Sequence, residues 1–332
     1  MRVAVVMGGR STEHDVSLRS GQQVMNAIAD QRPLPVVIGK DGRWVIDGQP
    51  ARSIGEAIDR LVAEAEVVFI ALHGPHGEDG TIQGLFETVG LAYTGSGVLG
   101  SALAMDKVRA KLVYQVRGLP TAPFEVLTPK RWREEKNAVM AAIGERIGYP
   151  AVFKVARGGS SVGVTFPKDA AELERAVSAT FRDSDLALVE RFVKGRELTC
   201  GVLEDAEKGT VFALPVTEIV PDARYAFFDY EAKYTPGATQ EITPARVSPE
   251  IAGRVQALAL AAHEWLDCRD FSRTDVMIGE NDQPVVLETN TIPGLTAQSL
   301  LPQAAAVAGY PFPKLIGLLL DNARHRRRAS AR

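Results

Sequence analysis

Short apolar runs alternate with stretches of helical spacing along the first third of the chain. Continuous apolar runs predict buried strands, and apolar residues three or four positions apart predict helices. The expected strands are 3–7, 34–38, 44–46 and 67–72, and the expected helices are 16–28 and 54–63. Strands that alternate with helices favour a parallel sheet with covered faces, so this part is expected to be an α/β unit.

The regular alternation ends near residue 96, where a long helix is expected over 96–116. Beyond it, the expected strands are 124–127, 151–154, 187–192, 197–203 and 211–216, and the expected helices are 132–147 and 170–181. This mixture is typical of an α+β arrangement. Residues 221–244 show no clean periodicity, and so long a loop in a compact protein is usually functional or disordered.

Composition and charge narrow the class of protein. The chain has 332 residues, of which 45% are hydrophobic and 24% charged, as in globular proteins of two or three domains. No apolar run reaches the roughly 18 residues of a membrane span, and the N-terminus lacks the features of a signal peptide. A net charge of -3 argues against a nucleic-acid partner. Cys200 and Cys268 show no metal spacing, so the expected location is the reducing cytoplasm.

Arginine is concentrated at the C-terminal end of the chain. Residues 324–328 contain four arginines, namely Arg324, Arg326, Arg327 and Arg328. A charge run at a chain end is usually solvated, so residues 326–332 are expected to form a basic, frayed tail.

Residues 273–290 carry apolar residues on both sides of a polar tip, which predicts a hairpin that turns near Asn281 and Asp282. With the turn centred there, Asp275 faces Glu288 and Arg273 faces Asn290. Directly opposed residues project from the same face of a sheet, so these four side chains are expected on one face. Carboxylate and carboxamide oxygens suit Mg²⁺. An exposed polar face on an edge hairpin remains an alternative.

Two glycine-containing loops follow expected strands and could approach phosphate. In residues 157–163, glycines leave the backbone N–H groups accessible, and Lys154 just before the loop adds a positive charge. Residues 8–14 join the first strand to a helix, where an anion could bind. Neither loop has the dinucleotide or Walker pattern, and each is also compatible with an ordinary turn.

Residues 73–80 combine two histidines and two acidic residues with glycine and proline at the end of a buried strand. Ligands bind at the carboxyl ends of strands in open α/β sheets. The histidines and acids suggest a zinc site, whereas the glycines and proline suggest a structural turn.

Together these motifs resemble the D-alanine–D-alanine ligases of the ATP-grasp superfamily. The resemblance runs in order from about residue 3 to about residue 323 and is carried by eight motifs. They are GGRSTEHDVSL (8–18), ALHGPHGEDG (71–80), TGSG (94–97), MDK (105–107), GGSSVG (158–163), FDYEAKY (228–234), RTD (273–275) and ETNTIPG (288–294).

The resemblance implies an ATP-grasp fold with an N-terminal Rossmann-like parallel-sheet domain. The implied domains are residues 1–95, a central ATP-grasp subdomain at 96–192, and a C-terminal subdomain at 193–325 whose lid loop spans about 221–244. The implied reaction joins two D-alanines through an acyl phosphate and releases ADP and phosphate, for peptidoglycan synthesis. A homodimer is expected as the assembly.

Site residues carry over position by position from the family motifs. The resemblance implies Lys107, Lys154, Glu190, Glu197 and Lys233 for ATP, and Asp275, Glu288 and Asn290 for a pair of Mg²⁺ ions, with Mn²⁺ as a substitute. It implies Arg273 and the Gly294 N–H for the oxyanion, and a network of Glu13, Ser160 and Tyr234 for closing the lid. Glu13, His73, Ser299 and Leu300 are the implied contacts to D-alanine.

Tyr234 bears on which acceptor the enzyme uses. Relatives that make the D-alanine–D-lactate ester carry histidine at this position, so tyrosine favours an amine acceptor. The main alternative is an ATP-grasp ligase with another small amino acid or hydroxy acid as acceptor. A non-catalytic ATP-binding module would be expected to lack a metal ligand or Arg273, and a Rossmann oxidoreductase needs a glycine fingerprint that is absent here.

Overall fold

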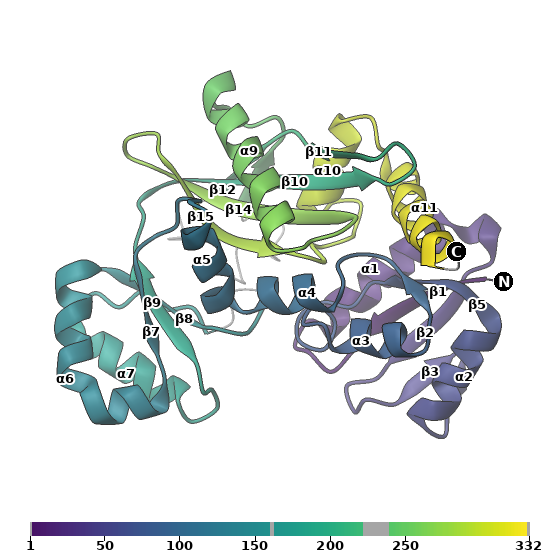
Figure 1. Ribbon diagram of the computed structural model, residues 1–332, viewed down its shortest axis with the longest axis horizontal. Coiled ribbons are helices and arrows are strands. Elements are labelled where there is room, and N and C mark those ends of the chain that lie inside the picture. Colours follow the sequence, from purple (N-terminus) through teal and green to yellow (C-terminus); the bar gives the residue numbers. More distant parts are fainter. Residues whose placement is uncertain (1, 160–162, 222–238, 331–332) are drawn as a thin grey trace.

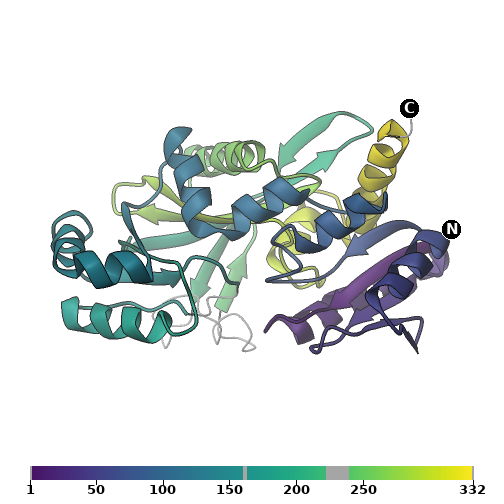
Figure 2. The ribbon, with the colours of Figure 1, turned by 60° about the horizontal axis from the view of Figure 1, so that its bottom comes forward.

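The computed structural model describes residues 2–159, 163–221 and 239–330 of the chain. Three sheets are arranged along it, each covered by helices (Figure 1). Two views show the first and the central sheet at opposite ends of the molecule, with the C-terminal sheet bridging them (Figures 1 and 2). Within the described residues, no helix is both long and apolar enough to cross a membrane.

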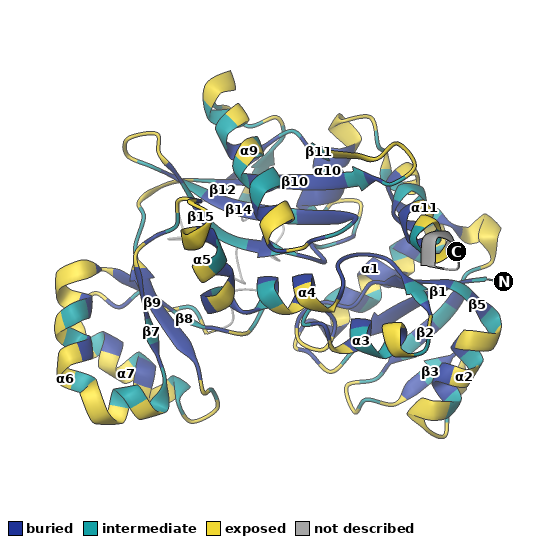
Figure 3. Ribbon diagram, viewed as in Figure 1, coloured by how far each residue is buried: buried dark blue, intermediate teal, exposed yellow. Residues whose placement is uncertain are grey.

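The first sheet has a parallel centre, as the sequence predicts. Its elements are β1 (Arg2–Gly8), α1 (His14–Ala27), the 3₁₀ turn η1 (Ala29–Gln31), β2 (Leu34–Ile38), β3 (Trp44–Ile46), β4 (Gln49–Pro50), α2 (Ile54–Glu64), β5 (Ala65–Ile70), α3 (Thr81–Thr88) and β6 (Ala92–Tyr93). The order is β4-β3-β2-β1-β5-β6; β2, β1, β5 and β6 pair in parallel, whereas β3 and β4 form an antiparallel edge. The continuous apolar runs of β1 and β5 are buried because helices or other elements cover both faces (Figure 3).

The prediction of one long helix over 96–116 is wrong, because this segment forms two helices. These are α4 (Val98–Met105) and α5 (Lys107–Val116). Asp106 between them has the extended backbone of a helix N-cap, and its carboxylate accepts a hydrogen bond from the Arg109 N–H at 3.1 Å. Arg157 Nε also donates to this carboxylate, at 3.0 Å. The break between the two helices is therefore in contact with Arg157.

The central unit is a small antiparallel sheet, order β7-β9-β8, with two helices packed on it. Its elements are β7 (Phe124–Leu127), α6 (Pro129–Arg146), β8 (Ala151–Val155), α7 (Ala170–Thr180) and β9 (Ala187–Arg191). Alternating residues of the strands pack against apolar residues of α6 and α7, while the outer sides of these helices remain exposed (Figure 3). The helices occupy one face of the sheet, and residues of the other face, among them Val152, Lys154 and Glu190, line a cavity.

The C-terminal unit is built on an antiparallel sheet of order β13-β12-β10-β14-β15, with β11 paired to β10. Its elements are β10 (Gly195–Asp205), β11 (Thr210–Ala213), β12 (Thr217–Pro221), β13 (Thr239–Ile242), α9 (Pro249–Trp265), β14 (Phe271–Gly279), β15 (Pro284–Asn290), α10 (Leu300–Val307) and α11 (Phe312–Ser330). The stretch 221–244, expected to lack regular structure, contains β13, which pairs with β12. Residues 222–238 of that stretch lie outside the described residues.

The last two helices share a hydrophobic core with the first sheet. Apolar residues of α10 and α11, such as Leu301, Leu315 and Leu319, belong to the same buried cluster as Val5 and Phe69 of the first sheet. Helix α11 packs against α1, β5 and β6. The end of the chain therefore joins the first sheet to the C-terminal sheet.

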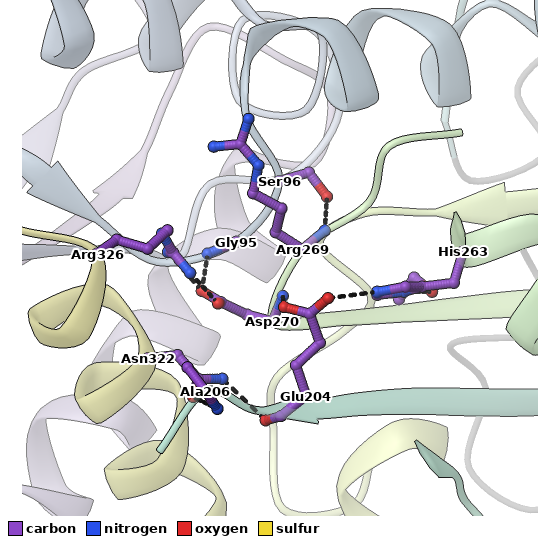
Figure 4. A network of polar contacts seen from close by, with 10 residues as sticks. Gly95, Ser96, Glu204, Ala206, His263, Arg269, Asp270, Asn322 and Arg326 are labelled. Carbon is purple, nitrogen blue, oxygen red and sulfur yellow. Dashed lines mark hydrogen bonds and ion pairs between the residues drawn. The ribbon is translucent and has the colours of Figure 1, made fainter. Parts of the chain in front are cut away.

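A buried ion pair anchors α11 at this junction, so the expectation of a frayed tail is wrong for Arg326. Its guanidinium donates to both oxygens of Asp270, which is 0% exposed (Figure 4). It also donates to the backbone carbonyl of Tyr93. The backbone N–H of Gly95 donates to the same carboxylate at 2.7 Å. Burial raises the pKa of Asp270, and the guanidinium opposes this effect.

The pair belongs to a wider polar network around β10 (Figure 4). The Asp270 N–H donates to Glu204 at 2.8 Å, and His263 lies 3.2 Å from the other carboxylate oxygen of Glu204. Asn322 of α11 donates to the Glu204 carbonyl at 2.9 Å and accepts from the Ala206 N–H. The tail is thus held by polar contacts that its amino-acid composition did not indicate.

We expect Arg326→Met to destabilise the protein by about 3 kcal/mol or more, because it leaves the buried Asp270 carboxylate without its cation. Urea unfolding measures this change. Arg327→Met is the matched control, since Arg327 makes an exposed contact with the Glu66 carbonyl. The double variant Asp270→Asn with Arg326→Met should recover much of the loss. Equal costs for Arg326→Met and Arg327→Met would show that the buried pair contributes nothing.

Candidate functional site

A cavity of about 810 Å³ lies where the three sheets meet, a volume typical of ligand sites. All thirteen described candidate residues line it. They are Glu13, His73, Lys107, Lys154, Glu190, Glu197, Arg273, Asp275, Glu288, Asn290, Gly294, Ser299 and Leu300. The other three candidates, Ser160, Lys233 and Tyr234, lie outside the described residues. Motifs spread along the whole sequence therefore meet in one place.

The hairpin β14–β15 has the predicted residue pairs at the cavity, but a bulge in β15 produces them instead of a regular ladder. Asp275 pairs with Glu288 and Arg273 with Asn290, but Val276 pairs with Val286, so the ladder contains a bulge at Leu287. The turn is also centred on Asn281, half a residue earlier than expected, since the Gly279 N–H donates to the Gln283 carbonyl. In a regular ladder with this turn, Asp275 would face Leu287. The bulge thus restores the facing carboxylates.

Cations hold both carboxylates of this hairpin face. Arg273 Nε and Nη2 donate to the two oxygens of Asp275 at 2.9 Å each, and the Thr199 hydroxyl donates to Asp275 at 2.6 Å. The pKa of Arg273 is raised, because the attraction of Asp275 outweighs the burial that would lower it. Lys107 Nζ lies 3.2 Å from Glu288 and donates to the Gly158 carbonyl at 2.9 Å. Lys107 therefore connects the hairpin with the glycine-rich loop.

The donor set of this face fits a hard divalent cation. Asp275, Glu288 and Asn290 offer only oxygen ligands from one face of one hairpin. Among the described residues, no three His, Cys, Asp or Glu side chains form a group that could hold a metal by themselves. A Mg²⁺ ion here would take its remaining ligands from water and from phosphate oxygens, as it usually does.

A buried carboxylate shared by two lysines forms the wall beside the central sheet. Lys111 Nζ lies 2.7 Å from one oxygen of Glu190, and Lys154 contacts the other oxygen. Burial alone would raise the pKa of Glu190, but the two ammonium groups lower it to about 2. Lys111 was not predicted from the sequence. Its position four residues after Lys107, on the same helix face, was the available signal.

Apolar side chains line the same cavity as this carboxylate. Phe166 and Phe192 meet edge to face, with ring centroids 5.9 Å apart. Val152, Met277 and Leu287 are also part of the lining. A slot with apolar walls and a few polar groups suits a flat heteroaromatic ring.

The Glu13 side chain lies between the loop that contains Gly74 and the loop that contains Gly159, at the other side of the cavity. A methyl group on Gly74 or on Gly159 would overlap with Glu13 Oε2, so the Glu13 carboxylate lies against both loops, and Gly74 also has a positive φ of 72°. Glu13 precedes α1 and is buried. The carboxylate thereby brings the first sheet and the glycine-rich loop into contact.

His73 is a neutral hydrogen-bonding residue, and the zinc interpretation of its motif is wrong. Its Nδ1 lies 3.0 Å from the Ile292 carbonyl, which can only accept, so the proton is on Nδ1 and Nε2 accepts from the Ser20 hydroxyl at 2.9 Å. Burial lowers the pKa of His73. Both ring nitrogens are engaged, and His76 is exposed.

Glu78 of the same motif was not assigned a role from the sequence. It lines the cavity and accepts hydrogen bonds from the N–H groups of Gly74 at 2.7 Å and Ile292 at 3.2 Å. Burial and the nearby Glu13 carboxylate raise its pKa to about 8. Glu78 therefore connects the first sheet to the segment after β15. At neutral pH its carboxyl group is protonated.

Helix α10 begins at the cavity, where Ser299 is its N-cap. The Ser299 hydroxyl accepts from the Thr296 N–H at 3.1 Å, and a side chain on Gly294 would strike it. Gln23 of α1 accepts from the Ala297 N–H at 2.6 Å. A helix N-terminus fixed in this way is a suitable site for a carboxylate.

Two family models match the chain. The model described as the D-ala D-ala ligase N-terminus matches residues 2–96, and the D-ala D-ala ligase C-terminus matches residues 113–321. The chain is 45% identical to the D-alanine–D-alanine ligase of Syntrophobacter fumaroxidans over 324 residues, which is 97% of each chain.

Solved structures are similar over nearly the whole length. A D-alanine–D-alanine ligase from Bacillus anthracis, complexed with ATP, has a TM-score of 0.80 and 30% identity and covers 99% of both chains. The VanG D-Ala:D-Ser ligase from Enterococcus faecalis has a TM-score of 0.82 and 29% identity, covering 97% of this chain and 99% of that one.

The raised pKa of Glu78 predicts a loss of stability at alkaline pH. The folded protein keeps a proton that the unfolded chain releases near pH 4.5, so the free energy of unfolding falls as pH rises through about 8. Between pH 7 and pH 9 we expect a fall on the order of 1 kcal/mol, measured by urea unfolding. Glu78→Gln cannot ionise and should show a smaller fall, whatever its stability at pH 7. The same fall in both proteins would refute the protonated state of Glu78.

Proposed function

The chain belongs to the D-alanine–D-alanine ligase family, and we propose that the cavity is the active site in which it joins two D-alanines. The reaction converts ATP to ADP and phosphate and supplies the dipeptide for peptidoglycan synthesis. The fold is the ATP-grasp fold of the structural relatives. The observation that carries the site assignment is that all thirteen described candidate site residues line the same cavity.

The nucleotide is assigned to the part of the cavity beside the central sheet. The apolar slot around Phe166 and Phe192 suits adenine, and Glu190 and Glu197 offer acceptors for its amino group and for the ribose hydroxyls. Lys107 and Lys154 would contact the phosphates, as would Lys233 in the part of the chain that is not described. The Bacillus anthracis relative is complexed with ATP, which supports ATP as the nucleotide.

Phosphoryl transfer depends mainly on positioning and on neutralising charge. Asp275, Glu288 and Asn290 would hold Mg²⁺, or Mn²⁺ in its place, and the metal would supply positive charge that neutralises the phosphates. Arg273 and Lys107 already pair with two of these ligands, so they hold the carboxylates in place and can turn toward phosphate oxygens.

The amino acids are assigned to the part of the cavity beside the first sheet. Glu13 would bind the ammonium group of the first D-alanine, whose carboxylate attacks the γ-phosphate to form an acyl phosphate and ADP. The amine of the second D-alanine, after losing a proton, attacks the carbonyl carbon and displaces phosphate. Arg273 and the Gly294 N–H would stabilise the oxyanion of the tetrahedral intermediate. Ser299 and the Leu300 N–H, at the start of α10, would hold the second carboxylate.

Water must be excluded while the acyl phosphate exists. We assign that role to a lid over residues 221–244, which Ser160, Tyr234 and Glu13 would tie to the first sheet. His73 would support the first substrate by keeping Ser20 and the Ile292 carbonyl in place. A cytoplasmic location and a homodimer follow from the family as further proposals.

Phosphate release with D-alanine as the only amino acid tests the function. We expect phosphate and D-alanyl-D-alanine in equal amounts. We expect little ester when D-lactate is offered as the acceptor, because the neutral side chain of Tyr234 does not repel the ammonium group of a second D-alanine. Chromatography of the products from D-alanine mixed with D-serine or D-lactate identifies the acceptor. Predominant mixed dipeptide or ester would favour the alternative acceptor, as in the D-Ala:D-Ser relative.

Glu288→Gln tests the metal assignment. It keeps the size of the side chain but removes one anionic ligand, so we expect the Mg²⁺ concentration for half-maximal rate to rise about tenfold or more. The rate is measured against Mg²⁺ at saturating ATP. Glu280→Gln, on the exposed hairpin tip, is the control and should leave the curve unchanged. An unchanged Mg²⁺ curve in Glu288→Gln would remove Glu288 from the metal site.

A further inference from the structure

Helix α5 carries two lysines one turn apart, and only one of them lines the cavity. Lys107 lines the cavity, whereas Lys111 is 1% exposed and lies behind the cavity wall. Residues four apart share one side of a helix, so both ammonium groups are directed to the same region. Lys111 belongs to none of the motifs that identify the family in this sequence.

Lys111 is held on several sides. Its Nζ lies 2.7 Å from Glu190 Oε2 and donates to the Thr121 hydroxyl at 2.5 Å, and the Phe124 ring centroid is 5.5 Å away. The Thr121 hydroxyl donates to the Val286 carbonyl of β15 at 3.1 Å. The ammonium group therefore has a fixed position between α5, β9 and β15.

The described lining of the cavity contains more carboxyl groups than cations. The carboxyl groups belong to Glu13, Glu78, Glu190, Glu197, Glu241, Asp275 and Glu288, and the cations are Arg19, Lys107, Lys154, Arg191 and Arg273. The cations of this wall therefore do not exceed its carboxyl groups in number, and further positive charge nearby would favour a polyphosphate chain. A buried cation just behind the wall supplies such charge without occupying space in the cavity.

Glu190 has one negative charge, and each of its oxygens contacts a different ammonium group. A single buried pair of Glu190 with Lys154 would already be electrically balanced. The second lysine is costly, since burial lowers the pKa of Lys111. Its presence leaves one positive charge in excess at this point of the wall.

We propose that Lys111 is a positioning residue that neutralises Glu190 and thereby leaves the charge of Lys154 available to the phosphate chain of the nucleotide. The inference rests on the proposed nucleotide site and extends it to a residue that does not touch the ligand. Without Lys111, both oxygens of Glu190 can turn to Lys154 and compete with phosphate for it.

Binding of ADP and adenosine without metal tests this role, because only ADP carries phosphates. Lys111→Met should weaken ADP binding about tenfold or more in isothermal titration calorimetry and change adenosine binding less than about twofold. Lys111→Gln, which keeps a polar side chain but loses the charge, should give the same ADP-specific loss. Lys136→Met, which removes an outer lysine paired with Glu174, is the control.

The double variant Lys111→Met with Glu190→Gln should recover the ratio of ADP to adenosine affinity, because Lys154 then has no carboxylate to neutralise it. Equal losses for both ligands, unchanged ADP binding in Lys111→Gln, or further loss of the ratio in the double variant would overturn the proposal. Wild-type protein that binds ADP no better than adenosine would overturn the proposed nucleotide site as well, which is a distinguishable result.

Discussion

The arrangement of this protein depends on neutralising carboxylates that are buried where separate parts of the chain meet. Asp270, just before β14, meets Arg326 of α11, and Glu190 of the central sheet meets Lys111 of α5. A buried charge without a partner costs several kcal/mol, so each pair restricts how its segments can pack. One pair joins the C-terminal sheet to α11, and the other joins the central sheet to α5.

The same constraint links structure to chemistry. Charges that hold the sheets together also line or adjoin the cavity, and phosphoryl transfer requires cations at fixed positions around the phosphates. Asp270 lies just before β14, the strand that carries Arg273 and Asp275. The contact of α11 with this point therefore supports the strand that bears the central residues of the site.

Local patterns in the sequence were sufficient for much of the fold. The parallel centre of the first sheet and the hairpin at 273–290 follow from continuous apolar runs and a polar turn, which act over short distances. The break at Asp106 was missed because an apolar helical pattern continues across it, and the capping carboxylate is recognised only by its contacts. The bulge at Leu287 was missed because no residue type there demands one.

The sequence by itself determined the family, through motifs whose order and spacing are specific, and with it the residues expected at the cavity. Only the tertiary structure decided which charges pair. Lys111 became a partner of Glu190, Glu78 became a protonated acid, and Arg326 became the anchor of α11. The physical reason is that desolvation and Coulomb interactions depend on distances between residues far apart in the chain, which residue type and local spacing do not encode.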